Sequence, residues 1–492
     1  MRRSLLLGVF AASACGTPVV TTPVPVAPVV ATSQVDLTKP PTLGPPPALS
    51  VPPIVTRQLA NGLKIIVVEQ HELPLADVVL EIKTGGEADP QGKPGTAAIT
   101  SAMLLEGTAT RTALQIDDQQ AFLGVSISAR SGWEQSPISL HTTTAQLDSA
   151  MALLADVALH PSFPVADLER VRKARLTSLQ QLRDRGPAIA DRAYAAALYG
   201  SEHPYGRPLA GTEASVASIA REDLQKFYAT YYRPNNATLL VVGDVTPDDV
   251  ERRAQALFGA WTSASVPAVT TATANTAKTT TLVLIDKPGA AQSSFRLGGI
   301  GAARSTRDYF ALQVLNTLLG GSFTSRLNQN LREEHGYTYG ASSGFSLRKS
   351  AGPFTASAEI VTAKTDSALM QFMKELASIR DTVPADELAK AKRYLQLGLP
   401  ENFETTGGIA GELLPLATYD VPLDFYNTAV QRIGAVTQAD VMRVARQYID
   451  LNTLTLVIVG DRKIIEPGLR AMKPGEIIIR ETRDVLGAPP TP

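Results

Sequence analysis

The 492-residue chain is poor in the residues that build metal sites and covalent cross-links. It holds one cysteine, Cys15, and five histidines, of which the two nearest in sequence, His141 and His160, lie 19 residues apart. A disulfide framework and a cysteine-built metal site are therefore excluded. Two side chains share a helix face when they are three or four residues apart, so a helical pair of histidine ligands is excluded as well.

An excess of charge of one sign is also lacking. The 46 Lys and Arg residues nearly balance the 47 Asp and Glu residues, and the mean hydropathy is +0.02. This balance does not favour binding to nucleic acid or to an anionic membrane surface through bulk charge. The hydrophobic content of 44% is typical of a globular protein, and the length suffices for roughly two to four domains.

The first 53 residues are expected to lie outside the folded body. A basic start and an apolar run from Leu5 to Ala14 predict a signal peptide over residues 1–15. Its end resembles a bacterial lipoprotein signal, which implies a lipidated Cys15 as the mature N-terminus; ordinary cleavage after Ala14 is the alternative. Gly16 then favours the outer membrane of the cell envelope, facing the periplasm. The prolines of residues 16–53 predict an extended tether.

The body contains a repeat. Phe227–Val250, FYATYYRPNNATLLVVGDVTPDDV, recurs as Val444–Glu466, VARQYIDLNTLTLVIVGDRKIIE. Each copy predicts a helix ending in tyrosine, a turn, and an apolar strand ending in Gly-Asp, and the glycines Gly243 and Gly460 lie 217 residues apart. So long a period indicates a duplicated domain, and irregularly mixed strands and helices predict an α+β fold. We expect a first domain at 54–261, a linker at 262–280, a second domain at 281–482 and a tail at 483–492.

Several segments together resemble the pitrilysin/insulinase family of zinc peptidases, which includes the mitochondrial processing peptidases. They are NGLKIIVVE (61–69), PGTAA with LLEGTATRT (94–112), HPYGRPLAGTEASVASI (203–219), FYATYYRPNNATLLVVGDV (227–245) and LGGSFTSRLNQNLREEHGYTYGASSGF (319–345). The likeness spans about residues 54–482. It implies two homologous α+β domains of the LuxS/MPP-like metallohydrolase type.

The zinc motif of this family is degenerate here. Family peptidases carry H-x-x-E-H on the helix that matches residues 94–106, where two histidines bind zinc and the glutamate activates a water molecule. The resemblance places Ala98 and Ala102 at the histidine positions and Ser101 at the base position. The third ligand, a glutamate, is expected within Arg170–Arg183, which contains no carboxylate. We therefore expect no metal in this chain.

The second half keeps a pair of residues that the family uses. Arg332 and Tyr339, seven residues apart, match an arginine and a tyrosine that steady the substrate carbonyl and its oxyanion at the zinc site of the other half; Tyr337 lacks this spacing. The alternative is an arginine paired with Glu333 or Glu334 and a tyrosine in the core. Gly320, Gly321 and Ser322 match a glycine loop that touches substrate in relatives, although a plain turn is equally compatible with them.

Two other residues are assigned structural roles. His203, in the segment HPYG, is expected to pack or to donate and accept hydrogen bonds. Glu106, which has no metal or histidine nearby in sequence, is expected to be a helix-end or surface acid.

These residues predict a catalytically incomplete subunit of a two-component zinc peptidase. A homologous partner would carry the zinc ion. This chain would supply Arg332 and Tyr339 and close a substrate chamber formed with the partner. An exposed edge strand would bind the peptide substrate in extended form. A non-catalytic scaffold or binding lipoprotein is the alternative. An enzyme with other chemistry lacks support, because Leu297–Arg304, LGGIGAAR, has glycines without the spacing of a phosphate-binding loop.

Overall fold

The body is built on two six-stranded sheets, one from each half of the sequence. The computed structural model describes residues 44–46, 48–269, 274 and 279–487, and residues 46–492 form one compact unit. The expected signal peptide, Cys15 and most of the tether lie outside the described residues. No described helix is both long and apolar enough to span a membrane.

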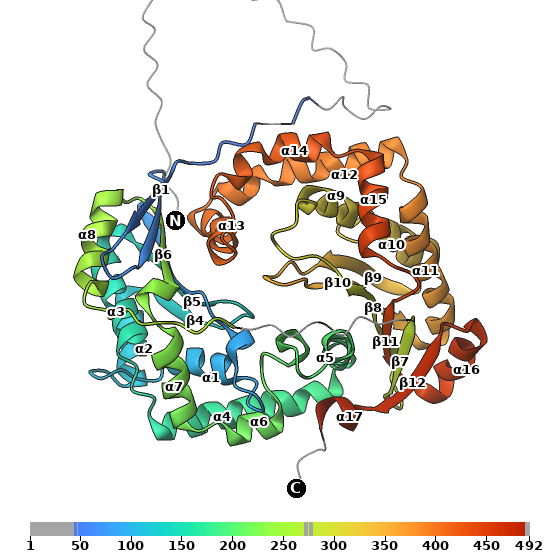
Figure 1. Cartoon of the computed structure of the whole chain (residues 1–492), viewed down its shortest axis with the longest axis horizontal. Helices are drawn as coiled ribbons and strands as arrows, with labels where there is room; N and C mark the ends of the chain where they lie inside the picture. Colours follow the sequence, from blue (N-terminus) through green and yellow to red (C-terminus); the bar gives the residue numbers. More distant parts are fainter. Residues whose placement is uncertain (1–43, 47, 270–273, 275–278, 488–492) are drawn as a thin grey trace, which may run out of the picture. The chain divides into compact units, whose positions relative to one another are not determined.

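The first sheet has the strand order β1-β2-β6-β3-β5-β4. Its strands β1, β6, β5 and β4 are labelled in Figure 1. β2 and β6 are parallel, and the other neighbours are antiparallel. The strands are β1 (Ile54–Gln58), β2 (Lys64–Glu69), β3 (Leu75–Ile82), β4 (Ser126–Ala129), β5 (Ser136–Thr143) and β6 (Ala237–Gly243). The helices of this half are α1 (Thr96–Met103), α2 (Ala113–Leu123), α3 (Leu147–Leu159), α4 (Val165–Gln181), α5 (Gly186–Tyr199), α6 (Glu213–Ser218), α7 (Arg221–Tyr231) and α8 (Pro247–Phe258).

The second sheet repeats this plan with the order β12-β7-β11-β8-β10-β9. Its strands are β7 (Thr281–Asp286), β8 (Gln292–Ile300), β9 (Thr338–Phe345), β10 (Pro353–Val361), β11 (Thr455–Gly460) and β12 (Glu476–Glu481). The helices are α9 (Tyr309–Leu319), α10 (Arg326–Asn328), α11 (Thr365–Asp381), α12 (Ala385–Gly398), α13 (Thr406–Thr418), α14 (Ala429–Ala435), α15 (Gln438–Tyr448), α16 (Arg462–Met472) and α17 (Thr482–Leu486). The copies differ at one edge, since β12 is parallel to β7 whereas β1 is antiparallel to β2.

The expected repeat is a structural one. Its helices are α7 and α15, and its strands β6 and β11 occupy equivalent central places in the two sheets. Every residue of both strands is buried, as a continuous apolar run predicts for a strand covered on both faces. Two α+β domains of one type in a single chain are thus confirmed.

Each half covers one face of the other half's sheet. α5, from the first half, packs on β8 and β11 of the second sheet, where Ile189 and Ala190 join Val457 and Val459 in one apolar cluster. α13, from the second half, packs on β3 and β6 of the first sheet. This exchange joins the halves through buried apolar surface. Such burial contributes about 25 cal/mol per Å².

The segment before β1 contacts the second half as well. The side chains of Leu49, Val51 and Ile54 are partly buried against the main apolar cluster of the second half. β1 itself pairs with β2 of the first sheet. Leu49 and Val51, near the end of the expected tether, therefore pack against the folded body.

Candidate functional site

α1 is the helix on which the family motif falls. It begins where the Asp89 carboxylate accepts the backbone N–H groups of Gly95 (2.6 Å) and Ala97 (2.7 Å), a capping arrangement that satisfies two free donors of a helix N-terminus. The sequence led us to expect a helix up to Gly107, but α1 ends at Met103. The chain then tightens into turns in which the N–H groups of Leu104 and Glu106 bond only three residues back.

The three motif positions carry no metal donors. Ala98 and Ala102, one helical turn apart, are both half-buried. Ser101 is 1% exposed. Its hydroxyl lies 3.2 Å from the hydroxyl of Tyr232, the residue that follows α7. Its side chain is thus committed to packing. Two methyl groups cannot replace the imidazole ligands that zinc requires, and a buried hydroxyl cannot replace the glutamate that activates a water molecule.

The neighbouring helix α4 does not supply the missing ligands. Its expected ligand segment, Arg170–Arg183, contributes Arg170, which forms an ion pair with Glu106 of the turn after α1. Burial raises the pKa of Glu106, and Arg170 opposes this effect. Within the described residues, no three His, Cys, Asp or Glu side chains gather as a metal would need. Zinc therefore does not fit this site, and Glu106 joins α4 to the turn after α1.

Arg332 and Tyr339 lie on either side of one tight turn. Arg332 belongs to η6 (Gln329–Glu334), and Tyr339 lies in β9, the edge strand that pairs only with β10. The turn is closed by the Gly336 N–H bonding to the Arg332 carbonyl (3.1 Å), and Gly336 adopts φ +62°, a conformation that favours glycine.

The Tyr339 side chain is 93% exposed, so it is not a core residue. Tyr337 is the half-buried one: it packs against the second-half core and 5.0 Å from the His335 ring. The expected spacing therefore selects the tyrosine that faces outward. Neither Arg332 nor Tyr339 forms a hydrogen bond or ion pair with α1 within the described residues.

The guanidinium of Arg332 is held mainly by an aromatic ring. It lies 4.3 Å from the ring centroid of Phe323, and Nε stands 3.6 Å from the Glu333 carboxylate. Phe323 is 66% exposed and follows directly on Gly320, Gly321 and Ser322. The pairing with Glu333 that we considered as an alternative is present. Phe323, which the sequence analysis did not single out, is the residue that brings the glycine loop to the arginine.

The two glycines serve close packing rather than freedom of movement. A Cβ on Gly320 would lie 2.3 Å from the Ser343 backbone nitrogen in β9, and one on Gly321 would lie 2.6 Å from the Asn316 side chain. The Ser343 N–H also bonds to the Gly320 carbonyl (3.2 Å). The absence of side chains at these two glycines therefore lets the loop lie against β9 and the end of α9.

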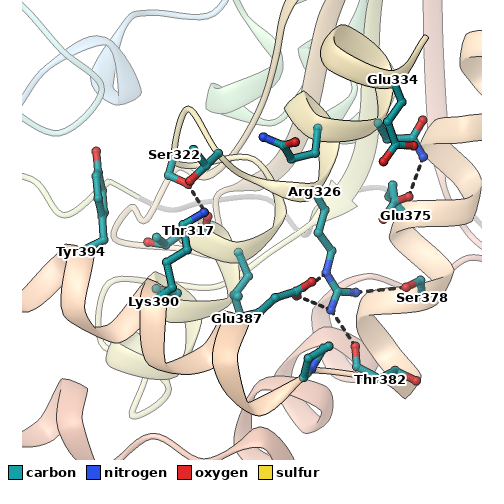
Figure 2. Close-up of a pocket in the computed structure, with 16 residues that line it drawn as sticks. Thr317, Ser322, Arg326, Glu334, Glu375, Ser378, Thr382, Glu387, Lys390 and Tyr394 are labelled. Atoms are coloured by element: carbon teal, nitrogen blue, oxygen red, sulfur yellow. Dashed lines mark hydrogen bonds and ion pairs between the residues drawn. The ribbon is translucent and has the colours of Figure 1, made fainter. Parts of the chain in front are cut away.

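A cavity of about 470 Å³ lies behind this loop, between α11 and α12 (Figure 2). Ser322 lines it, with its hydroxyl donating to the Thr317 carbonyl (3.1 Å). Arg326 anchors the loop by bonding Glu387 through two nitrogens (2.9 and 2.7 Å) and also Ser378 (3.0 Å). Neither Arg332 nor Tyr339 lines this cavity. Sequence reasoning missed Arg326, whose partners lie more than 50 residues away.

His203 has the structural role that was expected. It is buried, its Nδ1 accepts the Tyr205 backbone N–H (3.0 Å), and its ring lies 4.8 Å from the rings of Tyr199 and Tyr205. Burial lowers the pKa of His203, which favours the neutral imidazole. The Tyr205 hydroxyl in turn bonds to Glu134 and accepts the Ser350 N–H from the second half.

Comparison with known proteins gives one consistent result. The model of the insulinase family, peptidase family M16, matches residues 64–213, and the model described as the peptidase M16 inactive domain matches residues 218–395. An uncharacterized zinc protease of Mycobacterium leprae is 29% identical over 348 residues, covering 69% of this chain and 77% of that protein. One of Mycobacterium bovis is 28% identical over 424 residues, covering 84% of this chain and 95% of that protein.

Solved structures agree with the family models. The peptidase M16 inactive domain from Pseudomonas fluorescens superposes with a TM-score of 0.78 at 26% identity, covering 83% of this chain and 98% of that one. A protease from Helicobacter pylori gives the same TM-score at 21% identity, covering 83% of this chain and all of that one, and shows the fold alone.

The fold defines a duplicated α+β protein of the zinc-peptidase type, and within the described residues no group of side chains could hold a metal ion. The chain belongs to peptidase family M16, the insulinase family, and carries two M16-type domains.

Proposed function

We propose that this chain is the zinc-free subunit of a two-component M16 peptidase, to which it contributes Arg332 and Tyr339. The homologous partner carries H-x-x-E-H, the glutamate ligand and the zinc ion, and the assembled pair hydrolyses peptides. The observation that carries the proposal is the exposure of Tyr339 next to Arg332, combined with the absence of donors at Ala98, Ser101 and Ala102.

The chemistry assigned to this chain is charge stabilisation. The guanidinium of Arg332 keeps its donors free of hydrogen bonds within the described residues, and the Tyr339 phenol is open to solvent. Fixed donors of this kind stabilise the negative charge that develops on a carbonyl oxygen during hydrolysis. The edge strand β4 pairs only with β5, which suits the addition of an extended peptide. The outer edge of β9 is partly occupied, because the N–H groups of Ala341 and Ser343 bond to the Asn328 side chain and the Gly320 carbonyl.

The test compares the full chain alone, the partner alone and the reconstituted pair. Cleavage of a quenched fluorescent peptide is expected only from the pair, with zinc bound to the partner and none to this chain by elemental analysis. Chelator-sensitive cleavage by this chain alone would refute the proposal.

Two variants and a matched control locate the contribution. Arg332→Ala and Tyr339→Phe are each expected to lower turnover of the pair by about tenfold or more, whereas Tyr337→Phe should leave it unchanged. If both site variants keep full turnover, the pair is structural and the chain is better described as a scaffold or binding protein. Anchoring to the outer membrane through Cys15 belongs to the same proposal, and mass spectrometry of the mature N-terminus distinguishes a lipidated cysteine from ordinary cleavage.

A further inference from the structure

Arg304 is a buried arginine without an acidic partner. It lies in the loop between β8 and α9 and is 6% exposed. Its guanidinium carbon stands 4.3 Å from the ring centroid of Tyr309 and 4.7 Å from that of Phe425. Within the described residues its guanidinium forms no hydrogen bond and no ion pair. Arginine is rarely buried unless it is paired, and stacking on rings leaves its N–H donors unsatisfied.

Arg304 lines a pocket of about 330 Å³ to which both halves contribute. Gln135 comes from the first half, while Gln313 on α9 and Tyr419, which follows α13, come from the second. No Asp or Glu lines it, and Arg304 is the one Lys or Arg among the lining residues. Its electrostatic character is therefore that of a single positive charge with neutral donors around it.

The acids behind the lining side chains are already partnered. Glu134 accepts hydrogen bonds from the hydroxyls of Tyr419 (3.1 Å) and Tyr205. Glu412 accepts the Asn402 amide (2.7 Å). Neither carboxylate forms an ion pair with Arg304 within the described residues.

The neutral groups add donors and an apolar wall. The Gln135 Oε1 lies 2.9 Å from the Thr418 hydroxyl, and the amide N–H groups of Gln135 form no hydrogen bond within the described residues. Phe345 and Leu347 line another part of the pocket. A group with a planar negative end and an adjoining apolar side chain matches this arrangement.

We propose that this pocket binds a peptide carboxylate, held by the guanidinium of Arg304. The planar fork of arginine matches a carboxylate in bidentate fashion, and one cation balances one carboxylate charge, whereas a phosphate dianion would leave excess charge in the pocket. The carboxylate comes from the C-terminus of a peptide or from an acidic side chain. The choice of a peptide rests on the proposed function, but the binding itself needs no partner and no cleavage.

The experiment is calorimetric titration of the full chain with three N-acetylated tripeptides. The first ends in leucine as the free acid, the second is its C-terminal amide, and the third is an amidated peptide with a central glutamate. We expect the free acid or the glutamate peptide to bind about tenfold more tightly than the leucine amide, as the loss of a charged hydrogen bond implies. Which of the two binds identifies the source of the carboxylate.

Variants assign the binding to Arg304. Arg304→Gln should abolish the preference for the acid, and Arg304→Lys should weaken it several-fold, because a point charge lacks the bidentate fork. Arg432→Gln is the matched control: Arg432 also stacks on Phe425 (5.7 Å) but does not line the pocket. If Arg304→Gln does not fold, Arg304→Lys decides the matter.

Two results would overturn the inference: acid and amide bind equally well or not at all, or Arg304→Gln folds and keeps the preference. Failure of the reconstituted pair to cleave peptides would refute the proposed function and leave these titrations unaffected.

Discussion

Replacing Glu81 by glutamine should change how the stability of this protein depends on pH. Glu81 lies on β3 and is fully buried beneath α13, where its carboxyl group is hydrogen-bonded to the Thr418 hydroxyl. Its second oxygen, Oε2, has no hydrogen-bond partner within the described residues. Burial raises the pKa of Glu81 from its ordinary value of 4.5 to about 7, opposed by Thr418 and Lys83.

The size of the effect follows from the difference between folded and unfolded pKa values. Going from 4.5 in the unfolded chain to about 7 in the folded chain corresponds to roughly 3 kcal/mol. Because the folded chain keeps this proton at pH values where the unfolded chain loses it, stability is highest below about pH 4.5. It falls as the pH rises and reaches its lower level above about pH 7. Glutamine carries no charge at either pH and removes this contribution.

The assay is urea unfolding followed by far-UV circular dichroism at pH 5 and pH 8. We expect Glu81→Gln to be close to the wild type at pH 5 and more stable than it at pH 8, by up to about 3 kcal/mol. Glu476→Gln, at an exposed position on β12, is the control and should shift neither value. Burial also raises the pKa of Glu87 and of Asp89 to about 7, so a smaller pH dependence persists in the variant. An equal difference between variant and wild type at both pH values would refute the reasoning.

Two further outcomes are expected. Phe323→Ala should lower kcat of the reconstituted pair about two- to fivefold with little change in KM, because a partly exposed cation–π contact of about 0.5–1 kcal/mol positions Arg332. Phe323→Tyr keeps an aromatic ring and should restore kcat. A change confined to KM would contradict this role of Phe323. Gly243→Ala should destabilise the chain by roughly 2–3 kcal/mol in urea unfolding, because its Cβ would lie 2.2 Å from the Leu75 backbone carbonyl. A Cβ at Gly460 would contact only side-chain atoms, so Gly460→Ala should destabilise the chain less. Equal losses of stability in the two variants would contradict this difference.

The central strands and the duplication could be predicted because their signals are local. The sequences of β6 and β11 are continuously apolar and do not alternate between apolar and polar residues. Each strand ends at a glycine, Gly243 or Gly460, which lets neighbouring residues approach the backbone closely. The same locality explains why the spacing of Arg332 and Tyr339 identified the outward-facing tyrosine: one short turn separates the two residues. Such features depend on neighbours within a few residues along the chain.

The partners of the charged side chains could not be predicted, because they depend on contacts between segments far apart in sequence. Asp77 and Glu81 alternate with apolar residues on β3, a pattern that leaves their face to solvent. Only the folded chain brings α13 over that face, more than 300 residues later, and buries Glu81. Arg326 finds Glu387 in the same way.

The sequence predicted the α+β duplication, the absence of zinc ligands at Ala98, Ala102 and residues 170–183, and the place of the arginine–tyrosine pair. The duplication follows from the repeated segments alone, whereas the zinc-ligand positions and the arginine–tyrosine pair are placed by the resemblance to the family. The tertiary structure alone decided that each half covers the other half's sheet and that Phe323 holds Arg332. It also decided that Arg304, in a glycine-containing segment without a recognisable motif, is buried beside a pocket with no acid to pair it. The burial and the pairing of a side chain depend on surfaces that come together only when the chain folds, so a local sequence pattern does not predict them.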